Sequence, residues 1–205
     1  MKTLIFTLSI ILTFSIISCK KDSTTNENSL KKSKGVQPLS YIMNNQKIAD
    51  SLINNYGEAV ELGIRFKSSS NGIIHQVGLK SPVNGQFPVT IWEASTQKLL
   101  ATVNVNTKEN EFSYSSIAPL NIKANTEYII SFNNYDKGES QRYYVAQNRN
   151  REDIYPFYAY GIEFLDFRVS SSTTTKFPTI VPEYQQVNIP GILDFEIEFT
   201  GNSNS

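Results

Sequence analysis

The sequence predicts an all-β fold, either a sandwich or a barrel, and two patterns support this prediction. Apolar and polar residues alternate strictly over Val60–Phe66 and again over Leu193–Phe199, as in strands that bury one face. Between these segments lie short β-rich runs separated by Gly, Pro, Asn and Ser. Several short strands at such spacing are typical of all-β sandwiches and barrels.

Residues 1–18 have the pattern of a secretory signal peptide. The run from Leu4 to Ser18 is uncharged and follows Lys2, like the hydrophobic region of such a peptide. A membrane-spanning helix needs about 18 to 20 predominantly apolar residues, and this run contains several Thr and Ser residues before it ends at Cys19. We therefore expect these residues to be removed, with a retained anchor helix as the alternative.

The residues Ile16-Ile17-Ser18-Cys19 resemble the bacterial lipobox, in which cleavage leaves the cysteine as the first residue. The resemblance implies a diacylglyceryl group on Cys19 and, in many bacteria, an acylated amine. Two or more acyl chains anchor a protein stably, whereas one gives only marginal binding. The following Lys20-Lys21-Asp22 is similar to the start of many Bacteroidetes lipoproteins. We expect a lipid anchor in the outer membrane, on its periplasmic or its cell-surface face.

Cysteine content and charge exclude several functions. Cys19 is the only cysteine, which excludes intramolecular disulfides, multi-thiolate zinc sites and a cysteine nucleophile from the domain. The full chain has 19 basic and 19 acidic residues, and removal of residues 1–18 takes away only Lys2, which leaves a charge of −1. Nucleic-acid binders usually have a basic face or a high isoelectric point, so we expect no nucleic-acid partner.

The mature chain divides into a tether and one domain. Residues 19–38 hold the lipidated cysteine and a segment of Lys, Ser, Thr, Asn and Glu that is too polar to bury a core, so we expect a flexible, disordered tether. Residues 39–201 fit one β-sandwich domain, and residues 202–205 a disordered tail. Within the domain, five further runs predict strands: Ile73–Lys80, Val89–Ala94, Leu99–Val105, Phe112–Ile117 and Tyr128–Phe132.

Three other elements are expected from local patterns. Asn45–Asn54 predicts a short helix, because Ile48, Leu52 and Ile53 would share a face. Ser170–Lys176, with the sequence SSSTTTK, predicts a loop or hairpin tip. In the closing strand the alternation predicts a solvent-facing acidic row of Asp194, Glu196 and Glu198.

Three segments resemble the bacterial extracellular family known as domain of unknown function 4082: VELGIRFKSSSNGIIHQVGLK, VTIWEASTQKLLATVNV and IAPLNIKANTEYIISF. They carry the Glu61-Leu62-Gly63 strand, the hairpin from Trp92 to Leu100-Ala101-Thr102, and Pro119 before Thr126-Glu127-Tyr128. The resemblance covers about Val60 to Phe199 but departs at EFSYSSIAP and in the tyrosine-rich part. It implies an immunoglobulin-like or jelly-roll-like sandwich with no established catalytic activity.

Single residues offer little for catalysis or metal binding. His75 is the only histidine and lies in a predicted strand, where a solvated or hydrogen-bonded role is the commoner one. Glycosidase chemistry needs two carboxyl groups about 5 to 10 Å apart, and the candidates are Glu152, Asp153, Glu163 and Asp166, which also fit solvent-facing strand positions. Asn133, Asn134, Asp136 and Glu139 supply oxygen atoms of the kind that calcium takes, but they match no calcium-loop pattern. We expect no enzyme, no cofactor and no metal site.

The aromatic-rich stretch from Arg142 to Val169 is the best candidate for binding, since aromatic rings offer large apolar faces and tyrosine adds a polar group. Aromatic side chains also simply fill sandwich cores, as we expect for Trp92. The residues expected to be exposed for a ligand are Tyr155, Phe157, Tyr158 and Tyr160, with Arg142 and Arg149 as hydrogen-bond donors.

These observations predict a surface-tethered, non-catalytic module that binds a glycan or an envelope protein. The alternative is a structural or assembly lipoprotein of the cell envelope that binds no small ligand. That alternative predicts that Tyr155, Tyr158 and Tyr160 are buried or lie at a protein interface, because exposed apolar patches usually mark binding surfaces.

Overall fold

The structure is a computed structural model that describes residues 35–45, 48–54, 57–148, 152–183 and 187–200. The predicted signal peptide, Cys19, most of the predicted tether, Arg149 and residues 202–205 lie outside this described part. One helix and a series of strands make up the described chain: α1 (Pro38–Asn45), β1 (Ile48–Asn54), β2 (Val60–Ser68), β3 (Gly72–Lys80), β4 (Gly85–Glu93), β5 (Lys98–Thr107), β6 (Phe112–Ile122), β7 (Glu127–Asn133), β8 (Tyr135–Asp136), β9 (Glu139–Ser140), β10 (Tyr143–Asn148), β11 (Phe157–Ala159), β12 (Ile162–Ser171), β13 (Asn188–Pro190) and β14 (Ile192–Phe199).

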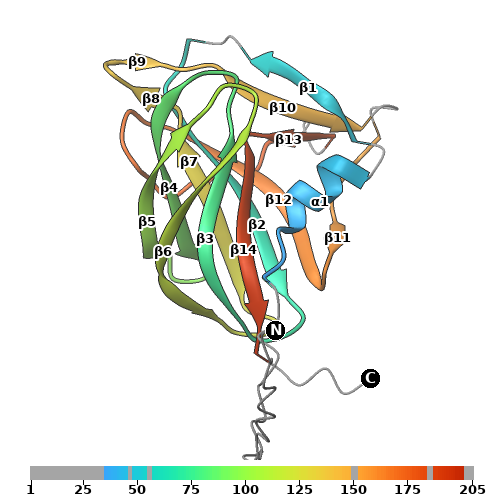
Figure 1. The fold of residues 1–205 in the computed structure, drawn as a ribbon. Helices are drawn as coiled ribbons and strands as arrows, with labels where there is room; N and C mark the ends of the chain where they lie inside the picture. Colours follow the sequence, from blue (N-terminus) through green and yellow to red (C-terminus); the bar gives the residue numbers. More distant parts are fainter. Residues whose placement is uncertain (1–34, 46–47, 55–56, 149–151, 184–186, 201–205) are drawn as a thin grey trace, which may run out of the picture. The chain divides into compact units, whose positions relative to one another are not determined.

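Two antiparallel sheets face each other, which confirms the predicted all-β sandwich (Figure 1). The larger sheet has the strand order β11-β12-β2-β7-β4-β5, and the smaller has the order β14-β3-β6. A third sheet, β1-β10-β13, lies across one end of the sandwich, and β8 and β9 form a small ribbon. All seven strands predicted from the sequence are present, most of them longer than expected.

The core lies between the two sheets and is rich in phenylalanine. Phe66 on β2 and Phe195 on β14 are fully buried, and their rings stack across the sandwich with centroids 4.6 Å apart. Phe164 on β12 stacks on Phe157 of β11 at the same centroid distance of 4.6 Å. The two strands with the clearest alternation, β2 and β14, therefore supply the centre of the core.

The helix prediction for Asn45–Asn54 is wrong. Residues Ile48–Asn54 form strand β1, which pairs antiparallel with β10, and the helix comes earlier, at Pro38–Asn45. Proline is favoured in the first turn of a helix, and Leu39 and Ile42 give α1 a buried face, at 0% and 2% exposed. Strand β1 is extended because it pairs with β10, about a hundred positions later in the chain. The local sequence gives no sign of this pairing. Within the described residues no helix has the length and apolarity to cross a membrane.

The predicted acidic solvent face of the closing strand is also wrong at Asp194, which is only 1% exposed. Glu196 and Glu198 are half-buried. The segment before α1 explains the burial, because Val36 pairs with Ile197 and α1 packs beside β14. The sandwich therefore already includes residues that the sequence assigned to the end of the tether.

The loop after β12 covers the outer face of the larger sheet. Strand β12 ends at Ser171, and the chain then crosses the sheet until Ile180 forms a bridge with Val169. On the way Phe177 packs against Trp92, with ring centroids 5.6 Å apart in an edge-to-face arrangement. The predicted loop at Ser170–Lys176 is confirmed for its larger part, and it lies over the sheet.

Candidate functional site

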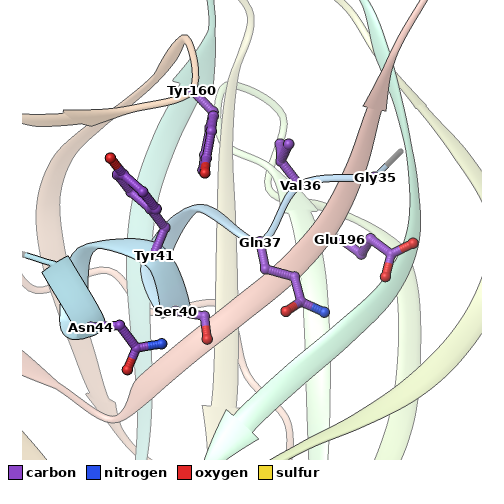
Figure 2. A pocket seen from close by; sticks show the side chains of 8 residues that line it. All are labelled: Gly35, Val36, Gln37, Ser40, Tyr41, Asn44, Tyr160 and Glu196. Carbon is purple, nitrogen blue, oxygen red and sulfur yellow. The ribbon is translucent and has the colours of Figure 1, made fainter. Parts of the chain in front are cut away.

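A hollow of about 510 Å³ opens beside α1 (Figure 2). Its volume falls within the range of about 300 to 1,000 Å³ that is common for small-ligand sites. Three separate parts of the chain form it: the segment leading into α1 with α1 itself, the turn after β11, and strand β14. The lining residues are Gly35, Val36, Gln37, Ser40, Tyr41, Asn44, Tyr160 and Glu196.

The buried carboxylate of Asp194 holds α1 in place. The first backbone N–H groups of a helix have no partner inside the helix, and here Leu39 and Ser40 donate theirs to the two oxygens of Asp194, at 3.0 and 2.8 Å. The Tyr114 hydroxyl donates to Asp194 at 2.9 Å, and so does the backbone N–H of Phe195. Burial raises the pKa of Asp194 to about 6, and these donors oppose the rise. The carboxylate is thus mainly ionised at pH 7, where it offsets the positive end of the helix.

Two exposed tyrosines form one wall of the hollow. Tyr41 of α1 is 41% exposed and Tyr160 is 47% exposed, and their ring centroids lie 4.7 Å apart at an interplanar angle of 56°. Tyr160 occupies the turn between β11 and β12, where it and Gly161 have positive φ values of 50° and 76°. Two consecutive positive φ values are typical of the tight turns that match the twist of a hairpin. The turn thus presents the Tyr160 ring towards α1 (Figure 2).

Polar side chains complete the lining. Gln37 and Asn44 carry amides, Ser40 carries a hydroxyl and Glu196 carries a carboxylate, so the hollow offers both hydrogen-bond donors and acceptors. The side chain of Glu196 lies against Gly35, where an added Cβ atom would come within 2.6 Å of it. The hollow therefore combines aromatic rings with polar groups, as binding sites for small polar molecules do.

The exposed aromatic set is only partly as predicted. Tyr158 and Tyr160 are exposed, at 62% and 47%, but Phe157 packs on the core and Tyr155 is half-buried with its hydroxyl enclosed. Burial raises the pKa of Tyr155 well above its usual value. Tyr160 lines the hollow, whereas Tyr158 donates a hydrogen bond to Glu163, at 2.9 Å, outside it.

The two predicted arginines do not contribute to the hollow as described. Arg142 is exposed just before β10 and is absent from the lining, and Arg149 lies outside the described residues. Sequence reasoning missed five lining side chains that carry polar groups: Gln37, Ser40, Tyr41, Asn44 and Glu196. Four of them were placed in the tether or just before the expected helix, and nothing local marks them as a site.

Two of the four acidic candidates for catalysis, Asp166 and Glu163, are held by basic partners, whereas Glu152 and Asp153 are exposed. Asp166 is 8% exposed and forms ion pairs with Arg65 at 2.5 Å and Arg168 at 3.2 Å. Its burial corrects the expected solvent-facing position, because Arg65 on the neighbouring strand lies directly opposite. Glu163 pairs with Lys67 at 2.9 Å. Within the described residues, no group of three or more His, Cys, Asp or Glu side chains is arranged to hold a metal ion.

A buried polar cluster lies under the loop that covers the larger sheet. Trp92 is 6% exposed, which confirms its packing role, and its Nε1–H donates to Ser131 Oγ at 2.8 Å. Ser131 in turn donates to Glu61 at 2.5 Å, and the Lys176 backbone N–H reaches the second carboxyl oxygen at 3.4 Å. Glu61 is fully buried, and that burial raises its pKa to about 7.

Close packing at Gly63 completes this cluster. A side chain there would meet Ile129 and Pro178 at 2.8 and 2.9 Å. Glu61, Gly63 and Trp92 belong to the motifs noted in the sequence. In the structure all three have the same role, because they fasten the Ser172–Ile180 loop to the sheet.

Comparison with known proteins gives one result. The model of a family described as "Domain of unknown function (DUF4082)" matches residues 46–185. No curated protein matches the chain.

Proposed function

The chain belongs to the DUF4082 family, and with the geometry of the hollow as support we propose that it is a lipid-anchored, non-catalytic module that binds a glycan. The observation that carries the proposal is the pair of exposed rings, Tyr41 and Tyr160, above a lining of amide, hydroxyl and carboxylate groups. Sugars have apolar C–H faces that pack on aromatic rings and hydroxyl groups that need hydrogen-bond partners. Both requirements are met within one hollow, where tyrosine supplies an apolar face with a polar end.

Affinity measurements on a polysaccharide panel test this proposal. The protein is the mature chain from residue 19 with Cys19→Ser, which prevents lipidation, and the readouts are affinity electrophoresis and calorimetry. The variant Tyr160→Asn removes the ring and keeps a residue that tolerates positive φ, and Tyr41→Ala removes the second ring. We expect each variant to bind about tenfold more weakly, because the loss of one ring contact should cost about 1.4 kcal/mol of binding free energy.

The matched control is Tyr158→Ala, which removes an exposed tyrosine outside the hollow. Its affinity should stay within about twofold of the parent protein. Equal losses in all three variants, or no binding to any polysaccharide of the panel, would contradict the proposal and favour the structural or assembly role.

The lipid anchor is tested separately in cells. We propose that Cys19 carries the acyl chains and that the protein resides in the outer membrane. Labelling with a tagged fatty acid should mark the wild-type protein and not Cys19→Ala, and membrane fractionation should place only the wild type in the outer membrane. An unlabelled wild-type protein would exclude the anchor without bearing on the glycan site.

A further inference from the structure

The charges around the hollow restrict the kind of sugar that fits it. Among the eight lining residues Glu196 is the only acidic side chain, and none is Lys, Arg or His. Glu196 lies against Gly35, on the side away from the two tyrosines in Figure 2. The charged group available to a ligand among the described lining residues is therefore a carboxylate.

The N-terminus of α1 does not offset this negative charge. A free helix N-terminus attracts anions, but here the Leu39 and Ser40 N–H groups are already taken by Asp194. Asp194 lies two residues before Glu196 on β14, and its charge is the one that the helix N-terminus offsets. Burial raises the pKa of the neighbouring Tyr114 hydroxyl, and the charges of Asp194 and Glu196 raise it further.

The tyrosine rings favour the same sign of ligand charge. The face of an aromatic ring carries partial negative charge and attracts cations within about 6 Å of its centroid. Two such rings, 4.7 Å apart, stand in the same hollow as the Glu196 carboxylate. An ammonium group on a sugar would be attracted by the Glu196 carboxylate when it lies beside that side chain and by a tyrosine ring when it lies over the ring. A uronate carboxylate would be repelled by Glu196, without a compensating cation among the described lining residues.

We infer that this site selects sugars by charge: it binds amino sugars more tightly than the matching neutral sugars and rejects uronic acids. The inference rests on the proposed glycan-binding function and adds the ligand class. Glu196 is the discriminating residue, Tyr41 and Tyr160 hold sugars of either kind, and the preference is electrostatic.

Three oligosaccharide series of equal length test the inference by calorimetry: glucosamine, N-acetylglucosamine and galacturonic acid oligomers. With the Cys19→Ser mature chain at low salt, we expect glucosamine oligomers to bind about three- to fivefold more tightly than the N-acetylated ones, the span of an exposed ion pair. Galacturonate oligomers should bind most weakly. High salt should shrink these differences, because it screens exposed charges.

The variant Glu196→Gln isolates the cause. It should make glucosamine and N-acetylglucosamine oligomers bind equally, because it removes the charge that distinguishes the two series while glutamine keeps hydrogen-bonding groups. A control variant in which Lys31, Lys32 and Lys34 become serine should keep the preference, which shows that the preceding lysines do not set it. Preference that survives in Glu196→Gln, or galacturonate binding as tight as neutral binding, would overturn the inference.

The outcomes separate this inference from the proposed function. If neutral oligomers bind and Tyr160→Asn weakens them, but the three series show no order by charge, the glycan site stands and charge selection is wrong. If no oligomer of any series binds, charge selection is overturned, and the polysaccharide panel alone decides whether the glycan site stands.

Discussion

Replacing Glu61 with glutamine should flatten the dependence of stability on pH. Glu61 is fully buried beneath the Ser172–Ile180 loop, with Ser131 and the Lys176 backbone N–H as its hydrogen-bond donors. Burial raises the pKa of Glu61 from 4.5 to about 7, because the charged form loses its hydration. Glutamine keeps the size of the side chain and an acceptor oxygen for Ser131 but carries no charge at any pH.

The sign of the effect follows from the order in which the two states ionise. Below about pH 4.5 the carboxyl is protonated in both the folded and the unfolded chain, and its contribution to stability is fully present. As the pH rises, the unfolded chain releases its proton first, so the free energy of unfolding falls until the pH passes about 7. The whole pKa shift of Glu61 corresponds to a fall of about 3 kcal/mol in the free energy of unfolding, of which about 2 to 3 kcal/mol occurs between pH 5 and pH 8.

Urea unfolding between pH 5 and pH 8 measures this loss, and the single tryptophan, Trp92, gives the fluorescence signal from within the same cluster. The wild type should lose about 2 to 3 kcal/mol more than Glu61→Gln over this range. Asp194 has a raised pKa of about 6 and the same sign of effect, but it is present in both proteins and cancels in the comparison. The exposed Glu109→Gln is the matched control and should follow the wild type. Parallel pH curves for wild type and Glu61→Gln would refute the reasoning.

Three further substitutions probe packing and the support of the hollow. Asp194→Asn replaces one acceptor oxygen with a donor, so it should lower the free energy of unfolding in urea by about 2 to 4 kcal/mol. It should also weaken glycan binding, because α1 carries Tyr41. An unchanged affinity would show that the position of α1 does not matter for binding. Trp92→Phe removes the hydrogen bond to Ser131 and should lower the free energy of unfolding in urea by about 1 to 3 kcal/mol. Equal free energies of unfolding for the variant and the wild type would show that this hydrogen bond does not stabilise the fold. Gly191→Ala adds a Cβ atom at a position with φ of 68°, where it would overlap the Phe132 ring. Thermal unfolding should show that the free energy of unfolding falls by about 2 kcal/mol or more. An unchanged melting temperature would contradict the close packing of Gly191 against Phe132.

The strands could be predicted because a period-two pattern states directly which side chains are buried. Val60–Phe66 and Leu193–Phe199 were predicted from alternation alone and lie within β2 and β14. The same rule failed at Asp194, an alternate polar position that the pattern assigns to solvent. Its partners, the N–H groups of Leu39 and Ser40, come from 155 and 154 positions earlier in the chain. An alternating pattern shows on which face of the sheet a side chain lies. It does not show whether another part of the chain packs over that face and buries it.

The hollow could not be predicted from the sequence, for a related reason. Tyr160 was predicted as an exposed aromatic, and its partner Tyr41 lies in a segment whose local signals pointed to a tether followed by a helix at Asn45. The ring pair exists because Asp194 fixes α1 and because the turn at Tyr160 and Gly161 aims the second ring at it. The sequence marks Tyr160 as an exposed aromatic but gives no signal at Tyr41, and the contact between the two rings depends on tertiary packing.

The place of the hollow along the chain bears on what the proposed module would meet in the cell. Gly35, Val36 and Gln37 line the hollow and directly follow the segment that links the domain to Cys19. The sequence predicts a flexible tether between Cys19 and Gly35, and a coil of that length has an average end-to-end distance on the order of 20 to 25 Å. With Cys19 in the membrane, the first lining residue would therefore lie on average about that far from the lipid surface. A glycan bound there would lie close to the membrane, which favours envelope polysaccharides carried near the lipid over long chains captured from the medium. Lengthening the linker should leave the affinity of the soluble protein unchanged and alter only which glycans the anchored protein retains on cells.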